Sequence, residues 1–131
     1  MTKDKALHAW FNKAVHKPNS DEYLPFYTAA SVPEDAAFPW GTYELITSAF
    51  EGGEVGITVE LWFYTTSEAI PNAAAAELSR AIGHCGAVIP CDEGYIWLKR
   101  GSPWCQSLRD EADANVKRRY INVTAEYLTT Y

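Results

Sequence analysis

The 131-residue sequence lacks the features that mark secreted or membrane-spanning chains. Its three cysteines, Cys85, Cys91 and Cys105, are an odd number, which disfavours a disulfide framework and favours reduced thiols. The opening residues, MTKDKALHAWF, contain no long apolar core and no small-residue cleavage site, so they do not resemble a secretory signal. No run approaches the roughly 18 apolar residues of a membrane span. We therefore expect a soluble protein that is cytoplasmic where it is made.

Motifs for catalysis and metal binding are also missing. No segment has the glycine spacing of a phosphate-binding loop, and the nucleophile pattern G-x-S-x-G is absent. His84 and the three cysteines lack the paired C-x2-C spacing that holds two zinc ligands on one turn, so small buried cysteines are the better interpretation. The clustered carboxylates fall in predicted turns, where they serve solvation. We expect no enzymatic activity, no metal and no cofactor.

Positive charge is scarce as well. The chain has 11 Lys and Arg against 17 Asp and Glu, a formal net charge of −6, which opposes general nucleic-acid binding. Its 47% hydrophobic and 21% charged residues are typical of a globular protein. A chain of this length is most simply one domain, here residues 1–131.

Two segments predict helices. Residues 3–15 place apolar side chains at helical spacing with charges between them, and the breaker run KPNS follows. Residues 68–82 are rich in alanine, with Ser67 as a candidate N-cap and Gly83 as the C-terminal cap. Pro71 falls near the first turn of this segment, where proline is tolerated.

Strand patterns fill most of the remaining chain. Residues 41–50 and 55–65 predict a hairpin around the turn Glu51–Gly52–Gly53–Glu54, and a short edge strand is expected within residues 25–30. Residues 87–90 and 94–100 flank a second turn, residues 104–117 predict a long loop or short helix, and residues 118–129 form a final strand. This order predicts an α+β fold, a mainly antiparallel sheet with two helices on one face.

Three of these strands carry large apolar or aromatic side chains on both faces. Side chains alternate along a strand, so both faces of such a sheet need cover, and two helices cover only one. A second protein subunit is the favoured cover for the other face. The candidate subunit interface consists of aromatic residues in these strands: Trp62, Tyr64, Tyr95, Trp97 and Tyr127. An aromatic face that stacks single-stranded nucleic acid is the alternative, although it requires a basic rim.

The predicted turn Glu51–Gly52–Gly53–Glu54 is a candidate exposed loop. Two glycines and two carboxylates make it exposed and negatively charged, with no apolar residue to anchor it. It is either a solvated turn or a tip that reaches a neighbouring subunit or a channel.

Four segments together resemble a known family: VPEDAAFPWGTYELITSAF, VELWFYTTS before the alanine-rich helix, VIPCDEGYIWLKRGSPWCQ and RRYINVTAEYL. They are similar to small minor tail, or minor capsid, proteins of long-tailed phages and prophages of Gram-positive bacteria, which resemble tail terminators. The resemblance extends from about Ala6 to Leu128. It consists of the overall residue pattern and short similar sequence segments, with no catalytic signature.

The resemblance implies an α+β protein that assembles into a ring, typically a hexamer, at the head–tail junction. Its implied partners are the tail tube protein and a head-completion protein, with DNA passing through the channel and no specific nucleic-acid binding. Its implied location is the host cytoplasm during assembly and then the virion, at the head-proximal end of the tail. A head-closure or neck protein of the same virion is the neighbouring alternative.

Overall fold

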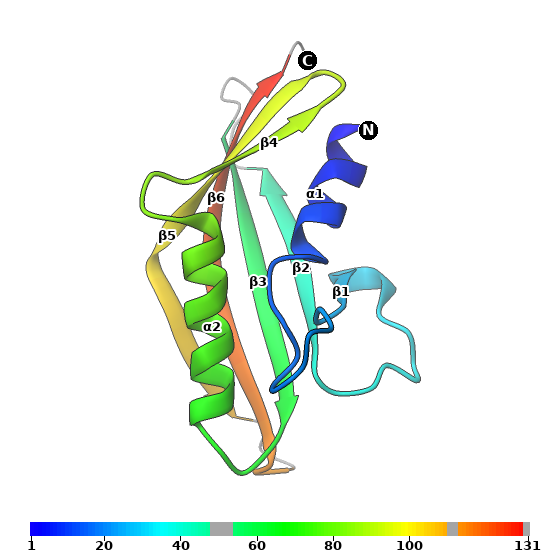
Figure 1. Ribbon diagram of the computed structural model, residues 1–131, viewed down its shortest axis with the longest axis vertical. Coiled ribbons are helices and arrows are strands. Elements are labelled where there is room, and N and C mark those ends of the chain that lie inside the picture. Colours follow the sequence, from blue (N-terminus) through cyan, green and yellow to red (C-terminus); the bar gives the residue numbers. More distant parts are fainter. Residues whose placement is uncertain (48–53, 110–112, 130–131) are drawn as a thin grey trace.

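The computed structural model describes residues 1–47, 54–109 and 113–129. Figure 1 shows a curled sheet with both helices on one of its faces. In this part of the chain the sheet has six strands in the order β1-β2-β3-β6-β5-β4. Every neighbouring pair is antiparallel except β1 and β2, which are parallel. The predicted α+β fold, with a mainly antiparallel sheet and two helices on one face, is confirmed.

The first helix, α1 (Lys3–Phe11), begins at a side-chain cap and ends earlier than predicted. The Thr2 hydroxyl accepts a hydrogen bond from the Lys5 backbone N–H at 3.3 Å. At the C-cap position the Asn12 side chain binds another element: its Oδ1 accepts from the Phe26 N–H at 3.0 Å, and its Nδ2 donates to the Phe26 carbonyl at 3.4 Å. Asn12 therefore joins the end of α1 to the outer edge of β1 (Phe26–Thr28).

The second helix, α2 (Ala69–Ile82), follows its predicted bounds closely. Glu68 occupies the N-cap position without a side-chain capping bond, and the Ser67 hydroxyl accepts from the Ala69 N–H at 3.2 Å. Gly83 ends the helix with a positive φ of 83°, and its N–H donates to the Ser79 carbonyl at 2.9 Å. Among the described residues, neither helix has the length and apolar character needed to cross a membrane.

The other strands are β2 (Trp40–Thr47), β3 (Glu54–Tyr64), β4 (Ala87–Cys91), β5 (Gly94–Arg109) and β6 (Val116–Thr129), and a 3-10 turn, η1 (Ala29–Ser31), follows β1. The expectation of a loop or short helix for residues 104–117 is wrong at both ends, because β5 continues to Arg109 and β6 begins at Val116. Pro103 falls within an irregularity between Arg100 and Cys105, so no regular ladder hydrogen bond is lost there. The Asn122 amide donates to the Pro103 carbonyl at 2.9 Å and holds the irregular segment against β6.

The core lies between the sheet and the two helices. Alternate residues of β3 and β6 point toward the helices and are buried, among them Ile57, Val59, Leu61, Ile121, Val123 and Ala125. Phe11 of α1 stacks on Tyr43 of β2 with ring centroids 4.9 Å apart and packs against Phe26 at 5.3 Å. Gly41 makes room for Phe26, since a Cβ at that position would lie 2.7 Å from the phenyl ring. This packing leaves the opposite face of the sheet without a helix.

Candidate interface on the helix-free face of the sheet

Aromatic side chains gather at one end of the helix-free face. We call this group the aromatic cluster: Tyr27, Phe38, Trp40, Trp62 and Tyr64. Trp40 and Trp62 are cross-strand partners in β2 and β3, and Phe38 lies 6.2 Å from Trp40 and 5.8 Å from Tyr64 between ring centroids. Phe38 and Tyr64 are 42% and 56% exposed, so a substantial apolar area faces solvent.

Arg118 extends this cluster across the sheet. The Trp40 and Trp62 rings stack at 5.0 Å with an angle of 15° between their planes, and the Arg118 guanidinium lies 4.7 Å from the Trp62 ring centroid. Trp62 of β3 has two cross-strand partners. They are Arg118 of β6 on one side and Trp40 of β2 on the other. Trp62 is therefore flanked on both sides by side chains of its own chain.

Two buried N–H groups in this ladder have no hydrogen-bond acceptor among the described residues. They are Trp62 Nε1 and Arg118 Nε. Arg118 also forms no ion pair in the described part of the chain. Buried polar groups are nearly always paired in folded proteins, so these two donors are exceptions within the stacked ladder.

The other end of the same face carries a second apolar group. We call it the distal patch: Val88, Pro90, Tyr95, Trp97 and Leu128, which the strand register places on one side of β4, β5 and β6. Val88, Tyr95 and Leu128 are each more than half exposed. Trp97 is fixed in place, because its Nε1 donates to the Cys85 carbonyl at 3.0 Å and the Lys99 ammonium lies 4.6 Å from its ring centroid.

The aromatic cluster and the distal patch are well separated. Arg118 and Leu128 are ten residues apart on the same face of β6, a distance of about 33 Å along a strand. Polar side chains lie between them, including Thr58, Asn122 and Thr124. One subunit thus presents two distinct apolar surfaces at opposite ends of one sheet face.

Of the predicted interface residues, Trp62, Tyr64, Tyr95 and Trp97 lie on the helix-free face, although in two groups. Tyr127 does not join them, because it packs against the core on the helix side of β6. Burial raises the pKa of the Tyr127 phenol, and the nearby Asp4 carboxylate raises it further. Residues of the face that the sequence did not single out include Tyr27, Phe38, Trp40 and Arg118. The candidate loop Glu51–Gly52–Gly53–Glu54 lies outside the described residues except for Glu54, where β3 begins.

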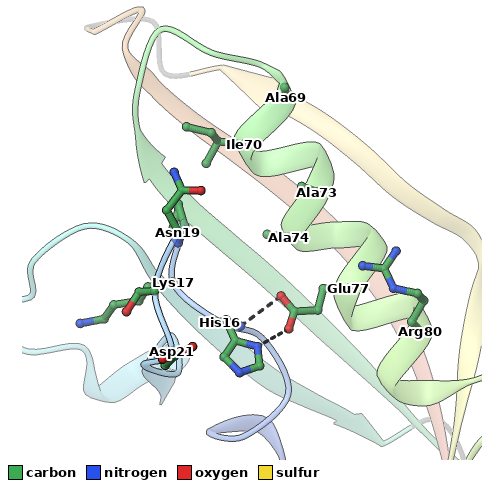
Figure 2. Close-up of a pocket in the computed structure, with 12 residues that line it drawn as sticks. His16, Lys17, Asn19, Asp21, Ala69, Ile70, Ala73, Ala74, Glu77 and Arg80 are labelled. Carbon is green, nitrogen blue, oxygen red and sulfur yellow. Dashed lines mark hydrogen bonds and ion pairs between the residues drawn. The ribbon is translucent and has the colours of Figure 1, made fainter.

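A groove of about 520 Å³ lies on the helix side, between α2 and residues 16–21. Figure 2 shows His16 turned toward Glu77 of α2 across this groove. The imidazole Nδ1 lies 2.6 Å from Glu77 Oε2, and the His16 backbone N–H donates to Glu77 Oε1 at 3.2 Å. The His16 ring also stacks on Tyr23 at 4.5 Å. These contacts attach the segment after α1 to α2, which is a structural role.

The described residues contain no group of three or more His, Cys, Asp or Glu side chains placed to hold a metal ion. The interpretation of the cysteines as buried is wrong, because Cys85 and Cys105 are exposed and Cys91 is half-buried. No protein-family model matches the chain, and no curated protein is significantly similar to it. The aromatic cluster and the distal patch on the helix-free face are the candidate functional surfaces of the described residues.

Proposed function

We propose that the chain is a structural protein of a long-tailed phage or prophage, a tail terminator or tail-completion component that forms a ring at the head–tail junction. The observation that carries this proposal is the helix-free sheet face, with the aromatic cluster at one end and the distal patch at the other. The four sequence segments that resemble minor tail proteins support it, and two of them contribute Trp40 and Trp62 to the aromatic cluster.

Two different apolar surfaces on one subunit suit a head-to-tail contact. In such a contact each copy meets its two neighbours through different parts of its surface, and the copies close into a ring when the rotation allows it. The family resemblance gives six as the expected number. The tail tube protein and a head-completion protein are the expected partners, and a head-closure or neck protein of the same virion is the alternative within this class.

The aromatic cluster suits protein contact better than nucleic-acid stacking. Base stacking requires a free aromatic ring face, and Trp62 has Trp40 on one side and Arg118 on the other. Trp97 has Lys99 over its ring. The formal charge of −6 also disfavours retention of DNA, which suits a protein through whose channel DNA must pass.

The test of this proposal is the mass of the purified protein by light scattering, alone and with a tail tube protein. We expect the wild type to form a ring and the variants Tyr64→Glu and Tyr95→Glu to form smaller species, because each places a charge on an apolar surface. More than half of each side chain is exposed, so both variants should melt near the wild-type temperature. Lys13→Glu, on the exposed side of the chain after α1, is the control and should assemble normally.

A wild type that stays monomeric at high concentration, with and without tail tube protein, would contradict the ring. Single-stranded oligonucleotides give the second readout, through tryptophan fluorescence. We expect no saturable quenching at moderate salt. Saturable quenching that weakens steeply with added salt would favour the nucleic-acid function instead.

A further inference from the structure

Two strands of the sheet have open segments that pair with a described strand on one side only. In β5, the β4 strand pairs only as far as Leu98, so residues 104–109 have a neighbour on the β6 side alone. In β2, the β1 strand pairs only with Gly41 to Tyr43, so residues 44–47 pair with β3 alone, and the turn η1 contacts β2 without a ladder. Open strand edges are templates for pairing with another chain.

Residues 104–108 of the open β5 segment lack a blocking charge or proline, although Pro103 and the irregularity precede them and Arg109 follows them. Natural edges are blocked by charged side chains, bulges or prolines. Residues 104–108 read Trp-Cys-Gln-Ser-Leu and contain no charge, and Cys105, Gln106 and Ser107 are exposed. The edge of β1, by contrast, is closed by the Asn12 side chain, which binds the Phe26 backbone. The exposed, uncharged edge of residues 104–108 indicates a surface that another chain covers in the assembled state.

The two open segments are also compatible in direction. β2 is antiparallel to β3, β3 to β6 and β6 to β5, so β2 and β5 run in opposite directions. A second copy that continues the sheet in the same orientation therefore presents its β2 antiparallel to the first copy's β5. A groove of about 420 Å³ lies beside the open part of β2 and is lined by α1, residues 28–30 and residues 43–45.

Unpaired charges lie beside each open segment, and they are of opposite sign. Arg118 is the cross-strand partner of Leu108 on the helix-free face, and it has no ion pair among the described residues. Glu44 of β2 lies on the same face and is exposed, and its carboxylate forms no ion pair in the described part of the chain. When Glu44 of one copy lies opposite Leu108 of the next, Glu44 is two strands away from Arg118 of that next copy. That separation is about 10 Å, within reach of the two side chains together.

We infer that residues 104–109 of β5 pair in an antiparallel sense with residues 44–47 of β2 in a second copy of this chain, and that Arg118 binds Glu44 across the contact. The inference rests on the ring proposed above and names the strands that join its subunits. The same register sets Leu45 beside Ser107, both on the helix side of the continued sheet. Each copy uses one open segment at each edge, so a closed ring leaves neither unpaired.

Charge reversal tests the ion pair. Arg118→Glu and Glu44→Arg should each weaken assembly by at least about tenfold in the concentration required, as expected for like charges in contact. The double variant should recover most of the wild-type assembly, measured by light scattering and sedimentation. Arg118→Glu combined with Glu126→Arg is the matched control, because Glu126 pairs with Lys99 within its own subunit and should not rescue.

Cysteine cross-linking tests the register without depending on the charges. Leu45→Cys and Ser107→Cys are introduced together into a chain whose Cys85 and Cys105 are changed to serine, and we expect disulfide-linked multimers after mild oxidation. Leu45→Cys with Thr124→Cys should give none. A wild-type ring with neither charge rescue nor this cross-link would overturn the strand pairing while leaving the ring intact, and cross-linking of Ser107→Cys alone would indicate a symmetric β5 dimer instead. A monomeric wild type would overturn the ring itself.

Discussion

Arg119 is a charged residue held inside the protein, with only 1% of its surface exposed on the helix side of β6. Its guanidinium donates to Glu68 Oε2 at 2.7 Å and to Asn72 Oδ1 at 3.0 and 3.1 Å, so one side chain binds the residues at the start of α2. Lys117, two residues earlier, lies 3.6 Å from the other Glu68 oxygen. Lys117, Arg118 and Arg119 form one basic run in the sequence. Because side chains alternate along β6, Lys117 and Arg119 contact Glu68 at the start of α2, whereas Arg118 lies on the helix-free face.

The Glu68 contact predicts a pH dependence. The hydrogen bond from Arg119 holds the pKa of the Glu68 carboxyl below its ordinary value, and the charges of Arg119 and Lys117 act in the same direction. The folded protein therefore binds this proton less readily than the unfolded chain does. The resulting stabilisation is complete above the unfolded pKa of about 4.3 and is lost as the pH falls through the lower folded pKa.

We accordingly expect Glu68→Gln to lower the urea midpoint at neutral pH and to reduce its further fall between about pH 5 and about pH 3. The matched control is Asp35→Asn, because Asp35 is exposed and makes no ion pair in the described residues. It should retain the wild-type slope. Equal slopes for Glu68→Gln and the wild type would show that this ion pair does not contribute to folding.

At the scale of elements, the sequence predicted the order of helices and strands, and the error fell on β5. Gly101, Ser102 and Pro103 are ordinary strand-breaking signals, yet β5 continues beyond them because the chain leaves the ladder after Arg100 and rejoins it at Cys105. That irregularity depends on contacts with Asn122 on another strand. A local pattern carries no information about such a partner, so the extension was not predictable from residues 101–109 alone.

Gly101 is the residue on which this irregularity depends most closely. A Cβ there would lie 2.6 Å from the backbone oxygen of Asn122, and a backbone atom moves less readily than the end of a side chain. We expect Gly101→Ala to destabilise the protein by about 1–3 kcal/mol, measured by urea unfolding. Ser102→Ala, at the adjacent exposed position, should change the stability by less than about 0.5 kcal/mol. Wild-type stability of Gly101→Ala would mean that β5 and β6 separate there at little cost.

Register set the second limit on prediction. The hairpin of β2 and β3 was predicted with its turn at residues 51–54, and within the described residues the two strands pair as far as Thr47 with Val55. A turn at residues 51–54 implies that Phe50 lies opposite Val55, whereas Thr47 is the partner of Val55, and such a shift of three residues changes every cross-strand partner. The sequence could therefore place Trp62 on an outward face but could not give Trp40 as its partner, and Phe38 joins the cluster from outside any strand.

At the scale of the whole molecule, the alternation of large side chains predicted a sheet with a helix-covered face and an uncovered one. Alternation within β3 and β5 assigned Trp62, Tyr64, Tyr95 and Trp97 to the uncovered face. Tyr127 lies an even number of residues from Ile121 and Val123 and therefore shares their face of the strand. The alternation pattern thus assigned Tyr127 to the core side, where it lies in the structure. The gathering of the others into two separate groups follows from strand length and stagger, which composition and alternation do not encode.

The glutamates of the candidate loop give a prediction at this scale, because their proposed role exists only in the assembled particle. Changing Glu51 and Glu54 together to glutamine should leave the melting temperature almost unchanged if the turn is solvated as the sequence predicts, since exposed charges contribute little to stability. If the loop reaches a neighbouring subunit or the channel, the double change should lower tail completion or head joining in a phage complementation assay. Normal infectivity of the double variant would make the loop an ordinary solvated turn.

The stacked indoles of Trp40 and Trp62 have an optical consequence. Two identical chromophores 5.0 Å apart and 15° from parallel couple their electronic transitions, and in a chiral setting this coupling produces a paired positive and negative band in circular dichroism. The pair lies within the aromatic cluster, so the band reports on the part of the surface where contact with another subunit is proposed. The folded chain thus carries its own chromophore at that surface, and assembly can be followed by light without attaching a label.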